Sequence, residues 1–178
     1  PMEIGERLIV VPEWEQANTQ GRIPLILNPG LTFGTGSHAT TRLCLTALEE
    51  TIHGGERILD LAAAAVSSPS PPWSWGLPRR RQWILIPRRW TWPMRTPPQR
   101  HRKGPVHVRA GDILTDRKLE AELGRGEVPL VLANIVADVI IPLSAWVPQV
   151  LSQDGVFLCS GIIAPRAQEV ADAWPGTV

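Results

Sequence analysis

The sequence of 178 residues lacks both long hydrophobic runs and a cysteine framework. No stretch approaches eighteen uninterrupted apolar residues, so nothing in it has the length of a membrane-spanning helix. The two cysteines, Cys44 and Cys159, lie far apart within apolar segments, a placement that favours buried reduced thiols over a disulfide or a metal site. No charged and then apolar leader opens the chain. We therefore expect a cytoplasmic protein with no membrane partner.

Acidic residues are absent from the middle of the chain. Residues 62–104 contain nine Lys or Arg and no acid, whereas the rest contains nine basic and seventeen acidic residues. Five of the eight tryptophans also fall in this segment. A basic segment rich in Trp is typical of nucleic-acid contact, so an RNA-binding module built on Arg79, Arg80 and Arg81 is one interpretation.

The remaining composition predicts one globular domain with alternating strands and helices. Hydrophobic residues make up 43% of the chain and charged residues 20%, as in ordinary soluble domains. Short apolar runs of the strand type alternate with longer helical patterns, which predicts an α/β fold on a mostly parallel sheet. The strands are expected at 8–11, 23–27, 56–61, 106–108, 128–133 and 156–161, and Asp154-Gly155 is expected to form the turn before the last of them.

Helices are predicted at four places, and one of them follows a glycine-rich stretch. Gly30, Gly34 and Gly36 precede a helix that begins within 37–41 and whose expected apolar face is Leu43, Leu45, Leu48 and Ile52. No Lys follows these glycines, so they do not form a Walker loop; an ordinary glycine-rich turn remains an alternative. A charged and exposed helix and loop is expected at 116–126, and further helices are expected at 137–151, with an interruption at Pro142, and at 166–174.

The exact residues of the glycine-rich stretch indicate more about function than the spacing of its glycines does. The run from Pro29 to Leu45 resembles the signature of the bacterial methyltransferases that modify large-subunit ribosomal protein L11, although that family usually has Ala, Thr and Pro in place of Thr32, Ser37 and Ala39. A second match lies at 130–141 and a third at 160–163. Three matches in the same order make the resemblance specific.

The resemblance implies a class I, Rossmann-like, S-adenosylmethionine-dependent methyltransferase domain at 23–178. Residues 1–22 would then be a linker from an N-terminal recognition domain, and the sheet would be truncated at both ends. The implied activity is methyl transfer from S-adenosylmethionine to lysine or N-terminal amines of ribosomal protein L11, free or on the large subunit. The implied chemistry needs no metal, and the implied partners include no DNA.

The resemblance also assigns candidate site residues, one position at a time. Asn134 would accept hydrogen bonds from the substrate amine and contact the cofactor, as Thr41 would. Asp112 would lie near the adenine amine, Ala62 stands at the first glycine of the cofactor loop, and Ile84 stands at the ribose-binding acid. From the residues alone, a helix cap is the favoured role for Asn134, whereas for Asp112 a turn cap and the adenine contact are equally good interpretations.

Residues 62–72 depart from the family pattern. A glycine loop is expected here, but the sequence reads Ala62-Ala-Ala-Ala-Val-Ser-Ser-Pro-Ser-Pro-Pro72. An alanine Cβ blocks both the close approach and the positive φ that glycine permits. As written, this segment cannot form the expected loop.

A reading-frame shift accounts for the departure. If each codon between about 62 and 104 is read one base out of phase, Trp83-Ile84 and Trp90-Thr91 must each encode Asp, and Trp75-Gly76 must encode Gly, because Trp has a single codon. Codons for Leu-Gly-Cys-Gly-Ser-Gly-Val-Leu-Ala-Ile with one base removed translate into the sequence of 61–70. We therefore expect a compensated frameshift over 62–104. An inactive methyltransferase remnant is the alternative if the written chain is the one produced.

Overall fold

The computed structural model describes residues 1–12, 14–16, 18–27, 39–53, 56–61, 82–86, 106–110 and 112–177. For residues 26–27, 82–86 and 106–110 only the backbone is considered. The glycines at 30, 34 and 36 and the alanine-rich segment beginning at Ala62 lie outside the described residues, so the expectations made for them remain predictions.

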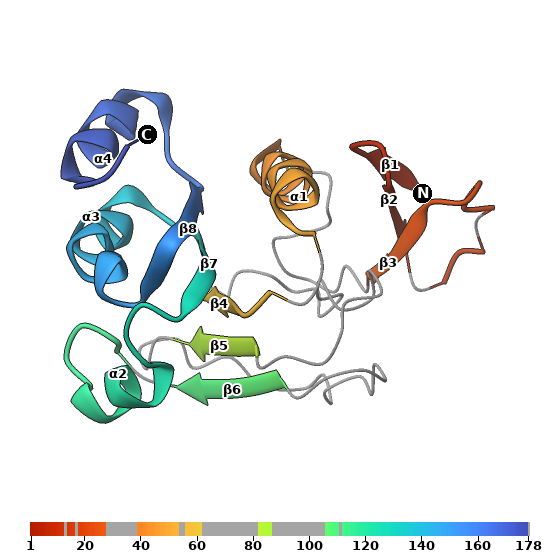
Figure 1. The fold of residues 1–178 in the computed structure, drawn as a ribbon. Coiled ribbons are helices and arrows are strands. Elements are labelled where there is room, and N and C mark those ends of the chain that lie inside the picture. Colours follow the sequence, from red (N-terminus) through yellow and green to blue (C-terminus); the bar gives the residue numbers. More distant parts are fainter. Residues whose placement is uncertain are drawn as a thin grey trace.

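The chain begins with a small three-stranded sheet in the order β1-β2-β3 (Figure 1). Strands β1 (Met2–Ile4) and β2 (Leu8–Pro12) are antiparallel, whereas β2 and β3 (Ile23–Leu27) are parallel. These bounds confirm the strands predicted at 8–11 and 23–27. Ile4, Leu8, Val10 and Leu25 form a small core, against which Leu45 of the following helix packs.

The second sheet has five parallel strands in the order β6-β5-β4-β7-β8. Its members are β4 (Ile58–Asp60), β5 (Gln82–Ile86), β6 (Val106–Ala110), β7 (Val128–Asn134) and β8 (Leu151–Ser160). After β4, the chain adds β5 and β6 on one side of that strand. It then returns to the other side of β4, where it adds β7 and β8. The order therefore reverses between β4 and β7, as in doubly wound α/β folds. The predicted α/β fold class is confirmed.

Helices cover both faces of this sheet. Helix α1 (Ala39–Thr51) packs Leu48 and Ile52 against Ile58 and Leu130 on one face. The other face is covered by α2 (Arg117–Leu123), α3 (Ala137–Trp146) and α4 (Ala167–Ala173). A 3₁₀ turn at Val147–Gln149 follows α3, and another at Ala164–Arg166 precedes α4. Strand β7 is thus buried on both sides, which explains its continuous apolar run. Among the described residues, no helix has the length and apolarity to span a bilayer.

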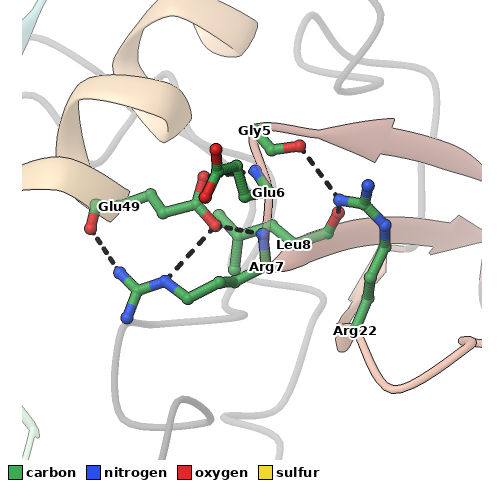
Figure 2. Close-up of polar contacts among 6 residues, drawn as sticks. All are labelled: Gly5, Glu6, Arg7, Leu8, Arg22 and Glu49. Carbon is green, nitrogen blue, oxygen red and sulfur yellow. Dashed lines mark hydrogen bonds and ion pairs between the residues drawn. The ribbon is translucent and has the colours of Figure 1, made fainter.

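A buried carboxylate joins the small sheet to α1 (Figure 2). Glu49, 7% exposed, accepts hydrogen bonds from the backbone N–H of Glu6, at 2.9 Å, and of Arg7. The Arg7 guanidinium pairs with the same carboxylate and donates to the Glu49 carbonyl. Gly5 has a φ of +55°, and a Cβ there would overlap the Glu49 carboxylate. The β1–β2 turn therefore closes directly over this side chain.

Two helix predictions are wrong in detail. Leu43 does not belong to the buried face of α1, because its side chain is 68% exposed. Leu43 and Leu45 are two residues apart, about 200° around a helix, so they cannot both face the core. The segment at 116–126 is not wholly exposed either, since Leu119 and Leu123 of α2 are buried.

Two predicted interruptions are also absent from the structure. Pro142 lies within α3 and does not divide it, because the buried Ile140 and Leu143 hold both sides of the proline in the core. Asp154-Gly155 is not a turn before β8 but lies inside it. From Val128↔Leu151 to Leu130↔Val156, β7 advances two residues and β8 five, so the extra residues of β8 form an irregularity within the strand.

Candidate functional site

The carboxyl ends of β4 and β7 meet where the strand order reverses. Asp60, the last residue of β4, pairs with Leu132 of β7, and the next N–H, of Leu61, donates to the Leu132 carbonyl at 2.9 Å. In open α/β sheets the crevice outside such a reversal is the usual ligand site. The residues that follow β4, β7 and β8 are therefore the candidates for binding.

Asn134 is the last residue of β7 and pairs with Ser160, the last residue of β8. Alternation along β7 places its side chain on the α1 side, with Leu130 and Leu132. Within the part of the chain that the structure describes, the half-buried Asn134 carboxamide makes no hydrogen bond. The N-cap of α3 is Val136, with no side-chain cap bond, so Asn134 is not the helix cap. Its amide is therefore a candidate for ligand binding.

The end of β8 connects this asparagine to helix α1. The Ser160 carbonyl accepts the Ile135 N–H at 2.9 Å, and the Ser160 hydroxyl donates to the Thr40 carbonyl at 3.4 Å. Thr41, a predicted cofactor contact, is the next residue of α1 and is half-buried. The structure therefore brings the first turn of α1 to the same sheet edge as Asn134.

Neither cysteine near this edge is poised as a nucleophile. Burial raises the pKa of the Cys44 thiol, a hydrogen bond with Ser160 lowers it, and the negative charge of Asp60 raises it further. Burial is also the main cause that raises the pKa of Cys159 to about 11, with a smaller contribution from Cys44. Both thiols are free and stay protonated at neutral pH. The sequence predicted buried reduced thiols, whereas both thiols are half-buried in the structure.

Of the other predicted site residues, the structure describes Asp112 and the backbone of Ile84. Asp112 is exposed beyond β6, and its carboxylate accepts the Leu114 N–H at 3.0 Å, which is the turn-capping role. Its adenine contact stays a prediction. The backbone of Ile84 lies in β5 opposite Asp60, two residues before that strand ends. Ala62 lies outside the described residues.

Sequence reasoning gave no role to Ser160 and Gly161, although they open the third family match. Gly161 has a φ of +84° and lies against Asn134 and Ile135. A glycine directly after an apolar strand was the available signal, because this is where a backbone needs a positive φ or a close approach.

Comparison with known proteins yields a consistent result. The family model "Ribosomal protein L11 methyltransferase (PrmA)" matches residues 1–65 and 106–176. A ribosomal protein L11 methyltransferase of Symbiobacterium thermophilum is 35% identical over 97% of this chain and 54% of its own length. A protein of the same name from Thermoanaerobacter pseudethanolicus is 34% identical over 96% of this chain and 53% of its own length. The chain spans about half the length of the curated relatives it matches.

A solved structure shares the fold. The crystal structure of a ribosomal protein L11 methylase from Lactobacillus delbrueckii subsp. bulgaricus superposes with a TM-score of 0.69 at 20% identity. The match covers 97% of this chain and 85% of that one. Together with the family model, which matches well over half of the residues, these similarities show that the chain belongs to the ribosomal protein L11 methyltransferase family.

Proposed function

We propose that this chain carries the catalytic portion of a cytoplasmic enzyme that transfers methyl groups from S-adenosylmethionine to lysine or N-terminal amines of ribosomal protein L11. The observation that carries the proposal is the carboxamide of Asn134. It stands at the strand-order reversal, on the sheet edge that α1 also reaches, and makes no hydrogen bond within the described residues. Family membership supplies the class of reaction.

The residues at this edge fit a cofactor of this kind. The edge presents the Asn134 amide, which has no hydrogen bond to any described residue, together with a hydroxyl in Thr41 and a bare backbone at Gly161. Such a surface suits a ligand that mixes polar groups with a flat ring system. Thr41 and Asn134 would hold the cofactor, and Asp112 would lie toward its adenine. When bound, the cofactor supplies an electrophilic methyl group on a sulfonium.

The chain itself would position the acceptor amine. The Asn134 carboxamide oxygen would accept a hydrogen bond from the amine and aim its lone pair, a contribution of proximity and orientation. A lysine amine has an unperturbed pKa of about 10.4 and must lose its proton before it reacts. Partial burial at the sheet edge, beside a positive sulfonium, would lower that pKa.

The alanine-rich segment limits what the written chain can do. The four consecutive alanines at 62–65 occupy the place of the glycine loop, and each carries a Cβ that the close approach to a cofactor excludes. The family model leaves residues 66–105 unmatched, which supports an out-of-frame segment over most of 62–104, although residues 62–65 still fall within the match. A remnant that folds but does not bind the cofactor is therefore the second candidate for the chain as written.

A binding comparison tests the proposal. Two chains are prepared, the written one and one in which 62–104 is replaced by the frame-restored reading, and S-adenosylmethionine is titrated into each in a calorimeter. We expect binding by the restored chain alone. Equal affinity of the two chains would refute the role given to the glycine loop.

A second experiment tests the substrate. The restored chain is incubated with S-adenosylmethionine and ribosomal protein L11, and the products are analysed by mass spectrometry. We expect mass increments of methyl groups on lysine or N-terminal amines, which an Asn134→Ala variant does not produce. Cofactor binding without any methylated product would contradict the proposed substrate.

A further inference from the structure

We infer that Gly161 is a positioning residue, whose bare α-carbon fixes the carboxamide of Asn134 for the acceptor amine. The inference deepens the proposed function and depends on it for its catalytic meaning. Its geometric content, that Gly161 determines where the Asn134 amide lies, can be tested without any reaction.

Three close approaches define the contact. A Cβ placed on Gly161 would lie 2.9 Å from the carbonyl oxygen of Ile135, 3.0 Å from its nitrogen and 3.1 Å from Oδ1 of Asn134. The first two atoms are backbone and cannot rotate away. A side chain at 161 would therefore have to separate the end of β8 from the Asn134-Ile135 segment.

Backbone geometry makes the same demand on this position. The φ of Gly161 is +84°, a conformation that residues with a Cβ rarely adopt. The preceding Ser160 is held on both sides, by the Ile135 N–H at its carbonyl and by the Thr40 carbonyl at its hydroxyl. The end of β8 therefore cannot move away from the Asn134-Ile135 segment without breaking the first bond, or from α1 without breaking the second.

The Asn134 carboxamide relies on this contact because nothing else in the described residues holds it by a hydrogen bond. A carboxamide that must receive a ligand cannot be fixed by strong internal partners. Packing of Oδ1 against the bare α-carbon of Gly161 forms no hydrogen bond, so it would restrict the rotation of the carboxamide while its donors and acceptor stay unpaired within the described residues. Gly161 would thus fix the position of the Asn134 side chain and still let its polar atoms bind a ligand.

Selective labelling gives a direct test. The chain has three asparagines, Asn18, Asn28 and Asn134, so ¹⁵N-asparagine labelling produces three side-chain NH₂ signals, and Asn134→Ala identifies the one of interest. In Gly161→Ala we expect the Asn134 signal to shift and the Asn18 signal to stay in place. An unmoved Asn134 signal would overturn the inference.

Gly21 offers a matched control. Its φ is also +84°, but a Cβ there would meet no atom within 4 Å. Gly21→Ala therefore imposes the same backbone strain without any new contact. The Asn18 Oδ1 accepts the Gln20 N–H at 3.1 Å, next to Gly21, so this variant is expected to shift the Asn18 signal and leave the Asn134 signal unchanged. A shift of the Asn134 signal in both variants would mean that strain, not contact, is the cause, and would overturn the inference.

A measurement on the unchanged chain covers the case in which Gly161→Ala does not fold. Side-chain ¹⁵N relaxation of Asn134 should report a rigid group, with an order parameter near the value of about 0.85 typical of ordered backbone. A value below about 0.6, typical of flexible groups, would overturn the inference.

Kinetics then tests the catalytic meaning in the frame-restored chain. We expect Gly161→Ala to lower kcat for methyl transfer roughly 10- to 100-fold with little change in the KM for the methyl donor, because a misplaced group costs orientation and not binding. Unchanged kcat in a variant whose Asn134 signal has shifted would overturn the positioning role. Absence of transfer by the unmutated restored chain would instead count against the proposed function and leave the labelling result intact.

Discussion

Two glycines with positive φ each bring backbone against a polar side chain, and the two contacts serve different ends. At Gly5 the backbone closes over Glu49, whose carboxylate receives two N–H groups and the Arg7 guanidinium (Figure 2). At Gly161 the backbone closes on Asn134, whose carboxamide has no hydrogen bond within the described part of the chain. The Glu49 carboxylate is satisfied and stabilises the fold, whereas the Asn134 carboxamide is unsatisfied within the described residues, and we propose that it is kept for a ligand.

Removing the Glu49 carboxylate should have the largest effect on stability. Glu49→Ala leaves the N–H groups of Glu6 and Arg7 without acceptors and should cost about 2–4 kcal/mol in the free energy of unfolding, since hydrogen bonds to a charged group are each worth roughly 1.5–3 kcal/mol. Urea denaturation followed by circular dichroism measures it. Glu50→Ala, at the exposed neighbouring position, is the control and should change stability by less than about 0.5 kcal/mol. If Glu49→Ala and Glu50→Ala lowered the free energy of unfolding equally, the contacts of Glu49 would not be what stabilises the fold.

A side chain at position 5 should have the next largest effect. Gly5→Ala places a Cβ where the Glu49 carboxylate lies and forces alanine into a φ of +55°, for which the backbone alone costs about 1–2 kcal/mol. In the Glu49→Ala background the steric part should vanish and only the backbone part remain. Strict additivity of the two substitutions, measured by the same denaturation, would show that Gly5 and Glu49 do not interact.

The thiol of Cys159 should give a smaller, pH-dependent effect. Its folded pKa of about 11 exceeds the ordinary value of 9.0, so the folded chain keeps a proton that the unfolded chain releases. The contribution of this thiol to the free energy of unfolding is at its maximum below pH 9 and is lost as the pH rises toward 11. At pH 8, iodoacetamide should modify Cys159 in a Cys44→Ser variant up to about 100-fold more slowly than an unfolded thiol, because the thiolate fraction falls tenfold per pKa unit and burial, the main cause of the shift, is retained. Similar rates would show that burial does not protect it.

Asn134 should give the smallest effect on stability. Asn134→Ala removes a side chain that has no hydrogen bond within the described residues, so the free energy of unfolding should change by less than about 0.5 kcal/mol. The same variant should abolish methyl transfer in the frame-restored chain. A loss of stability comparable to that of Glu49→Ala would mean that Asn134 is a structural residue.

The sequence predicted the sheet better than the helix surfaces. The continuous apolar run that ends at Asn134 identified β7. A strand buried on both faces is apolar at every position, so its pattern does not depend on which face each residue takes. Leu43 was misassigned because two leucines two positions apart cannot share a helix face. Asp154-Gly155 reads as a turn by residue type, yet it is an irregularity inside β8, which only the pairing with β7 determines.

The position of Asn134 in the fold was predicted but its contacts were not, because those contacts join residues far apart in the sequence. Asn134 could be located because it ends a recognisable strand. Its contact with Gly161 spans the whole of α3 and β8, and the contacts of Glu49 join residues more than forty positions apart. Neither contact leaves a local pattern. The turn-capping role of Asp112, in contrast, involves a partner two residues away and was one of the two predicted alternatives.

One titration tests the central claim, that Asn134 stands ready for a ligand while Glu49 holds the fold. S-adenosylmethionine is added to the frame-restored chain labelled with ¹⁵N-asparagine, and the side-chain NH₂ signals are followed. We predict that the Asn134 signal moves with a saturable dependence on cofactor concentration. The signal of Asn18, which lies between β2 and β3 of the small sheet, should stay in place. Saturable binding in a calorimeter that leaves the Asn134 signal unmoved would contradict the account.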